Sequence, residues 1–135
     1  MIHMMFTALV ALSWTAFPWI ESDEDPLVEN ETIVAMFKEM NEQRVRAGLP
    51  EMVLDQELCE LSQRWSNRMA STGAFHHGGG ENVIARGQKT PVAAIGAWLR
   101  SPAHRAFLMG RSTRVGFGAQ KGAGGMWYWS GTFRK

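Results

Sequence analysis

Three histidines and a glutamate are the residues of this chain whose types and spacing fit site chemistry. His76 and His77 lead into a glycine run at 78–80, Glu81 follows directly, and His104 stands in the segment SPAHR. Neutral imidazoles bind Zn²⁺ or transfer protons near neutral pH. A glutamate beside them can complete a metal shell or act as a general base. The glycines let the backbone turn sharply and approach a ligand closely.

The spacing of these residues matches none of the common catalytic motifs. The sequence has no H-E-x-x-H pair, no nucleophile elbow, and no Lys-Ser/Thr after the glycines that would make a phosphate-binding loop. From the residues alone, His104 therefore fits either a site or a purely structural hydrogen-bonding role.

Helical periodicity and capping residues predict the elements that must position these histidines. A helix is expected from about Glu31 to Ala47, with Gly48 ending it, and its apolar stripe is Ile33, Val34, Met36, Phe37, Met40 and Val45. A second helix begins after the N-cap Asp55 and ends at Gly73, with Leu58, Leu61, Trp65 and Met69 on its apolar face. The histidine–glycine stretch therefore lies on a loop just past a helix.

The second half of the chain predicts two short helices and a terminal hairpin. The segment ENVIAR favours a short strand, Thr90-Pro91 begins a third helix, and Ser101-Pro102 begins a fourth that ends near Gly110. Segments 114–120 and 126–133 alternate like strands around the loop KGAGG. Helices followed by an antiparallel hairpin indicate an α+β fold.

The N-terminal residues differ in composition from the rest. Residues 4–20 are uncharged and mostly apolar, and the acidic run ESDEDP follows. We therefore divide the chain into a signal peptide or membrane-proximal hydrophobic segment at 1–20, an acidic spacer at 21–30, and the folded domain at 31–135. The alternative for the first segment is an N-terminal helix packed on the domain.

The net charge of +1 conceals an asymmetry between the two ends of the sequence. Six acids and no base lie between residues 21 and 31, whereas nine bases and no acid follow Glu81. The C-terminal part is expected either to be a solvated basic face or to contact an anionic surface. The single cysteine, Cys59, excludes an internal disulfide and is expected to be buried, as are most of the six tryptophans.

Four segments in this order resemble a bacterial member of the CAP superfamily, named for cysteine-rich secretory proteins, antigen five and plant pathogenesis-related proteins. They are MNEQRVRAGLPEMVLDQELCELSQRWSNRMA, FHHGGGENV, AWLRSPAHRAFLM and the strands VGFGAQ and WYWSGTF, and they span about residues 31–134. The resemblance implies a three-layer α-β-α sandwich around a central antiparallel sheet. It also implies secretion or surface exposure.

The same resemblance implies a cleft lined by two histidines and acidic residues, which binds Zn²⁺ in some family members. The matching positions are His77 (or His76), Glu81 and His104, with Asn82 fixing the loop. The family's second glutamate, after the tryptophan of the third helix, is missing here, because Trp98 is followed by Leu-Arg-Ser.

Three hypotheses follow for the role of these residues. The first is an extracytoplasmic binding module, secreted, periplasmic or membrane-anchored. It would use His76, His77, Glu81, Asn82 and His104 for a ligand, His77 and His104 for a metal ion, and its basic half for an anionic cell-envelope component or lipid.

The second is a hydrolase in which Zn²⁺ on His77 and His104 activates water and Glu81 is the catalytic base. In the third, the histidines only tie the loop to the short helix. Nucleic-acid binding is disfavoured because no recognition motif is present.

Overall fold

The computed structural model describes residues 24–78 and 82–135. The expected signal or membrane-proximal segment at 1–20 and the site candidate Glu81 lie outside these ranges. The elements follow in the order η1 (Leu27–Glu29), α1 (Glu31–Arg46), β1 (Val53–Leu54), α2 (Gln56–Thr72), β2 (Asn82–Arg86), α3 (Pro91–Leu99), α4 (Pro102–Leu108), β3 (Arg114–Lys121) and β4 (Trp127–Arg134).

The predicted helix ends are confirmed. Asn30 caps α1, and the Asp55 side chain accepts from the Leu58 N–H at the start of α2. Gly73 ends α2 with a φ of 71°, a left-handed conformation that favours glycine. Thr90 caps α3 in the same way as Asp55 caps α2.

The sheet has four strands in the order β1-β3-β4-β2. The β3–β4 hairpin and the β4–β2 pair are antiparallel, as expected, and Asn82 at the start of β2 pairs with Thr132. The two-residue strand β1 was not anticipated, and it pairs with β3 in parallel. The sheet is therefore mixed rather than wholly antiparallel.

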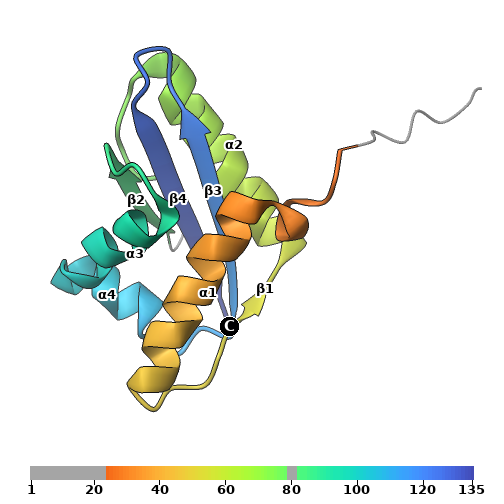
Figure 1. Cartoon of the computed structure of the whole chain (residues 1–135), viewed down its shortest axis with the longest axis vertical. Helices are drawn as coiled ribbons and strands as arrows, with labels where there is room; N and C mark the ends of the chain where they lie inside the picture. Colours follow the sequence, from red (N-terminus) through yellow and green to blue (C-terminus); the bar gives the residue numbers. More distant parts are fainter. Residues whose placement is uncertain (1–23, 79–81) are drawn as a thin grey trace, which may run out of the picture.

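The helices cover the two faces of this sheet, which confirms the expected α-β-α sandwich (Figure 1). Helix α2 packs along β3 and β4 on one face, and α1 and α3 pack on the other. Helix α4 follows α3 on that second side and reaches β2, the strand at one edge of the sheet. His77, which follows α2, contacts Asn82 at the start of this edge strand.

Helix α2 approaches the sheet unusually closely. A Cβ atom built on Gly116 would lie 2.0 Å from the Leu58 carbonyl carbon, and one on Gly118 would lie 2.4 Å from that of Ser62. The buried Ser62 hydroxyl donates to the Gly116 carbonyl at 2.9 Å. Glycine on the strand and serine on the helix thus let two backbones pack where larger side chains would separate them.

The buried face of α2 consequently differs from the predicted one. Ser62 and Ser66 are buried, whereas Leu61 and Trp65 of the expected apolar face are only half-buried. The Ser66 and Ser130 hydroxyls are 2.8 Å apart, so this interface between α2 and β4 is hydrogen-bonded as well as packed. Cys59 is buried here, as expected, and burial raises the pKa of its thiol to about 11.

The main apolar core lies between the sheet and the α1–α3 layer. Trp98, Phe117 and Phe133 are essentially inaccessible to solvent. Trp98 stacks on Phe117 with 6.1 Å between ring centroids, and Phe117 meets Phe133 edge-on with 6.4 Å between theirs. The Trp98 indole N–H donates to the Ile84 carbonyl of β2 at 3.0 Å. Trp98 therefore joins α3 both to the core and to the strand at the edge of the sheet.

The buried stripe of α1 contains an arginine where the sequence pattern suggested valine. Arg44 is only 2% exposed, while Val45, assigned above to the apolar stripe, is 55% exposed. The Arg44 guanidinium donates to the carbonyls of Pro50, Leu108 and Gly110, each at 2.9 Å. Burial lowers the pKa of this guanidinium. Arg44 thus ties the end of α1 to the end of α4.

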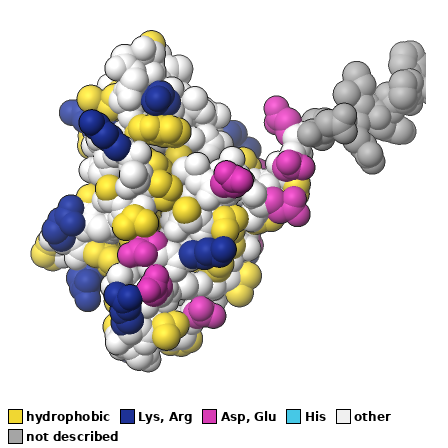
Figure 2. Space-filling view, viewed as in Figure 1, with side chains coloured by type: hydrophobic (Ala, Val, Ile, Leu, Met, Phe, Trp, Pro, Cys, Tyr) yellow, Lys and Arg dark blue, Asp and Glu magenta, His cyan; other side chains and the backbone are white. Residues whose placement is uncertain are grey.

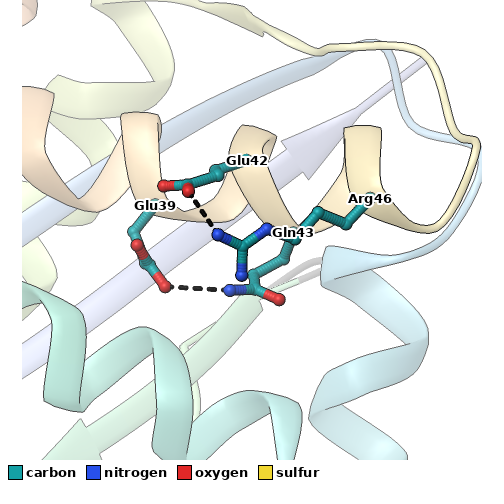
Figure 3. A network of polar contacts seen from close by, with 4 residues as sticks. All are labelled: Glu39, Glu42, Gln43 and Arg46. Carbon is teal, nitrogen blue, oxygen red and sulfur yellow. Dashed lines mark hydrogen bonds and ion pairs between the residues drawn. The ribbon is translucent and has the colours of Figure 1, made fainter.

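The solvent-facing side of α1 carries ordinary polar pairs at helical spacing. Arg46 forms an ion pair with Glu42 at 2.7 Å, and Gln43 donates to Glu39 at 3.1 Å (Figure 3). Acidic side chains lie over α1 and the chain that leads into it, and basic side chains lie both among them and over the neighbouring elements (Figure 2). Pairs at this helical spacing contribute little to stability, about 0.5 kcal/mol each.

Part of the segment expected to be a spacer is folded. Leu27–Glu29 form a short 3₁₀ turn whose Leu27 and Val28 side chains pack on the core. The Val28 N–H donates to the Gln56 side chain at the start of α2. In the part of the chain that the structure describes, no helix is both long and apolar enough to cross a bilayer.

Candidate functional site

The paired histidines lie on the loop that leaves α2 and enters β2. Their side chains point to different partners. The ring of His76 meets Trp65 of α2 edge-on, with 5.2 Å between ring centroids. The Trp65 indole N–H also donates to the His76 carbonyl at 3.1 Å. His76 therefore packs against α2.

His77 is the histidine that lies with His104. Their ring centroids are 6.1 Å apart and their planes are tilted by 39°. His104 belongs to the first turn of α4 and is half-buried, whereas His77 on the loop is exposed. The structure thus brings together two residues that are 27 positions apart in sequence, and it distinguishes between His76 and His77.

Asn82 fixes the orientation of His77. The His77 Nδ1 and Asn82 Oδ1 atoms are 3.2 Å apart, and Asn82 is buried at the start of β2. Because a carboxamide oxygen only accepts, His77 Nδ1 is the donor in this contact, and the neutral form of the ring then has its lone pair on Nε2. A hydrogen bond of this kind is what typically orients a metal-binding histidine.

His104 is kept neutral by its surroundings. Burial, and secondarily the positive charge that His77 can carry, lower the pKa of His104 below its ordinary value of 6.5. A neutral imidazole is the form that binds a metal ion or accepts a proton.

This shift gives a prediction for the metal-free protein. The unfolded chain takes up a proton on His104 at higher pH than the folded chain does. The free energy of unfolding should therefore have its full value above pH 6.5. It should decrease as the pH drops from 6.5 through the lowered pKa of His104 in the folded chain. Urea unfolding of the wild type and His104→Gln between pH 7.5 and 5 tests this. Equal pH slopes for the two proteins would contradict it.

A pocket of about 300 Å³ opens beside His104. Arg86 lies over the Phe75 ring at its margin, 4.6 Å from the ring centroid. The Gln88 Oε1 atom is buried without a hydrogen-bond partner among the described residues. The lining residues are Phe75, Ile84, Ala85, Arg86, Gln88, Ala97, Trp98, Ser101 and His104.

The sequence reasoning missed Phe75, Arg86 and Gln88 as part of this pocket. Phe75 stands directly before the histidines, and Arg86 and Gln88 follow the short strand that begins at Asn82. Their closeness in sequence to the histidine motif was the only signal that could have identified them. It was not sufficient, because the sequence does not show which of these side chains face the same pocket.

The acidic member of the motif, Glu81, is outside the described residues, so its place relative to the histidines is not part of this geometry. Within residues 24–78 and 82–135, no group of three His, Cys, Asp or Glu side chains comes together to hold a metal ion. The described site is thus a pair of imidazoles beside a pocket.

Comparison with known proteins places this arrangement in a family. The family model of the cysteine-rich secretory proteins, CAP, matches residues 37–133. This range contains the histidine pair and nearly the whole sheet. No curated protein matches the chain in sequence.

Several solved structures share the fold. An outer surface protein of Borrelia burgdorferi has a TM-score of 0.70 at 17% identity, covering 78% of this chain and 95% of that one. An extracellular SCP-domain protein of Bacillus anthracis has a TM-score of 0.66 at 23% identity, over 80% of this chain and 42% of that longer one. A hookworm platelet inhibitor has a TM-score of 0.65 at 12% identity, with 83% and 73% covered.

These structural similarities establish the fold, and the family model covers most of the sequence, including both histidines of the pair. The chain belongs to the CAP family of cysteine-rich secretory proteins.

Proposed function

We propose that this CAP-family chain is an extracytoplasmic binding module whose cleft holds a divalent transition metal ion, with Zn²⁺ the first candidate. The observation that carries the proposal is the His77–His104 pair, with His77 Nδ1 bonded to Asn82 and its Nε2 lone pair left for a ligand.

The donor set fits such an ion. Two neutral imidazoles are preferred zinc ligands, and a site with open positions can take a further protein or external ligand. The lowered pKa of His104 favours the binding form at neutral pH. Glu81 would be the next ligand along the chain, or the general base if the site proves hydrolytic.

The location and partner of the module are proposed on two grounds. Two of the structural relatives carry the descriptions outer surface protein and extracellular protein. The nine bases that follow Glu81 are all exposed. An exposed set of cations, of which Arg114 is paired with Asp55, favours association with an anionic component of the cell envelope, and salt should weaken this association. The bases are Arg86, Lys89, Arg100, Arg105, Arg111, Arg114, Lys121, Arg134 and Lys135.

A calorimetric titration of the metal-free full-length protein with ZnCl₂ tests the metal site. One-to-one binding is expected for the wild type. His77→Ala and His104→Ala should each abolish it, because one imidazole remains. Asn82→Ala should weaken it by about 10- to 100-fold, since the partner that orients His77 is lost.

His76→Ala is the matched control, because this neighbouring histidine packs on Trp65 rather than facing His104. Its zinc affinity should equal that of the wild type. Thermal melts of each variant separate a lost site from a lost fold. Zinc affinity that is unchanged in a folded His104→Ala protein would refute the metal site. Zinc-dependent turnover that disappears in Glu81→Gln while zinc still binds would assign the site to a hydrolase instead.

A further inference from the structure

A further hollow lies outside the pocket at His104. It is a groove of about 380 Å³ between α2 and the adjoining ends of β2 and β4, on the face of the sheet that α2 covers. The lining residues are Leu61, Arg64, Trp65, Arg68, Gly78, Asn82, Ser130, Thr132 and Arg134. We call it the arginine groove. Its volume falls within the range of small-molecule sites.

The floor of the arginine groove is polar, but its hydroxyls are occupied. Ser130 bonds to α2, and Thr132 Oγ1 lies 2.8 Å from the Ser62 hydroxyl. Because Ser62 donates its proton to the Gly116 carbonyl, Thr132 must donate to Ser62. These hydroxyls form the floor of the groove, and a ligand would be recognised by the residues of its walls and rim.

The walls are an aromatic ring and a backbone held close to it. Trp65 is half-buried, and a Cβ atom on Gly78 would lie 3.1 Å from its ring and 2.9 Å from Asn82 Nδ2. Only glycine therefore fits at position 78 without displacing a wall. Asn82 Oδ1 bonds to His77, which leaves its Nδ2 group as a donor without an acceptor among the described residues.

The rim carries three arginines from two elements. Arg64 and Arg68 are one helical turn apart on α2, and Arg134 ends β4. All three are exposed. Within the described ranges, the ion pairs are Arg46–Glu42 and Arg114–Asp55, so none of the three groove arginines is ion-paired there.

The three arginines are not equivalent. The Arg68 guanidinium lies 5.6 Å from the centre of the Trp65 ring, a cation–π contact that holds it at the groove. Arg64 also borders the adjacent hollow that contains Glu24, Asp25 and Glu60, whose charges oppose its own field. Arg68 and Arg134 should therefore contribute more to anion binding than Arg64.

We propose that the arginine groove binds the phosphate group of a ligand. A phosphate presents three terminal oxygens and up to two negative charges, which can engage several guanidinium forks at once. A carboxylate presents only two oxygens and one negative charge, so three arginines around one hollow favour phosphate. The Trp65 wall and Leu61 would contact the uncharged part of the ligand.

This inference deepens the proposed association with anionic envelope components by naming the residues and the chemistry. It does not depend on the metal cleft. The groove and the histidine pair adjoin at Asn82, but the three arginines belong to the groove alone, so their variants leave both histidines and Asn82 in place. The phosphate group can belong to a soluble molecule or to a lipid headgroup, and the two arms of the test separate these sources.

The test uses the full-length chain, freed of metal with EDTA, in 50 mM salt. In one arm, inorganic pyrophosphate is titrated by calorimetry. In the other, the protein is sedimented with vesicles of phosphatidylcholine containing 20% phosphatidylglycerol. The variants are Arg64→Gln, Arg68→Gln and Arg134→Gln. Arg111→Gln is the matched control, because this exposed arginine loses the same charge away from the groove.

We expect Arg68→Gln and Arg134→Gln each to weaken binding about tenfold or more, as loss of a charge-assisted hydrogen bond does. Arg64→Gln should weaken it less, and Arg111→Gln by less than twofold. Loss in the pyrophosphate arm supports a soluble ligand, and loss in the vesicle arm supports a lipid. Absence of binding in both arms, or an equal loss in Arg111→Gln, would overturn the proposal.

Discussion

Replacing Gly116 with alanine is expected to lower the free energy of unfolding by about 3 kcal/mol or more. The new Cβ atom would lie 2.0 Å from the Leu58 carbonyl carbon and 2.1 Å from the Cys59 nitrogen. Both obstacles are helix backbone, which cannot rotate away as a side chain can. Helix α2 would have to move off the sheet, breaking the Ser62 contact to the Gly116 carbonyl.

Urea unfolding monitored by circular dichroism measures this effect. Gly124→Ala is the control, because a Cβ atom at this exposed position in the β3–β4 turn meets nothing within 4 Å. Its stability should stay within about 0.5 kcal/mol of the wild type. A Gly116→Ala protein as stable as Gly124→Ala would mean that α2 is not held as close to β3 as described.

The second large effect is expected at Arg44. Arg44→Met keeps the length and apolar bulk of the side chain but removes its donors. The Leu108 carbonyl then loses its partner in a buried contact, and the carbonyls of Pro50 and Gly110 lose theirs in partly buried ones. The loss should be about 3 to 5 kcal/mol, the range for removing one member of a buried charged network.

Thermal and urea unfolding of Arg44→Met, Arg44→Lys and Arg46→Met test this role. Lysine should rescue little, because its single ammonium cannot reproduce the guanidinium fork. Arg46→Met removes the same charge from the exposed face of α1, where only the Glu42 pair is lost, and should cost less than about 1 kcal/mol. Equal stability of Arg44→Met and Arg46→Met would rule out the proposed anchor.

Local signals in the sequence predicted most of this fold. Asp55, Gly73 and Thr90 act through their own backbone and next few neighbours, so the helix ends they set could be read directly. The hairpin followed from alternation around KGAGG. The two-residue strand β1 could not be predicted, because its pairing with β3 depends on a contact about sixty residues away.

Burial was less predictable than secondary structure. A pattern of apolar residues assigns Leu61 and Trp65 to the core and Ser62 to the surface. The close contact with Gly116 reverses this, because the position nearest the strand must be small. The alternate glycines Gly116 and Gly118, which lie on one face of β3, were the signal in the sequence that a helix packs closely there.

The candidate site was partly predictable. The motif comparison selected His77, Asn82 and His104, and the structure places these three together. The choice between His76 and His77 needed the path of the loop, since adjacent side chains diverge. The arginine groove was not foreseen, because Arg64 and Arg68 precede the basic C-terminal part and meet Arg134 only through the packing of α2 on the sheet.

Two contacts of the sheet also bear on self-association. An unpaired strand edge can recruit a strand from another molecule. The Gln63 side-chain amide both accepts from the Ala119 N–H and donates to its carbonyl, so a side chain of α2 takes the place of a neighbouring strand on β3. At the opposite edge, the Trp98 indole N–H donates a hydrogen bond to the Ile84 carbonyl of β2. Each edge therefore has backbone groups already bonded to a side chain, which disfavours edge-to-edge pairing of two molecules at these positions.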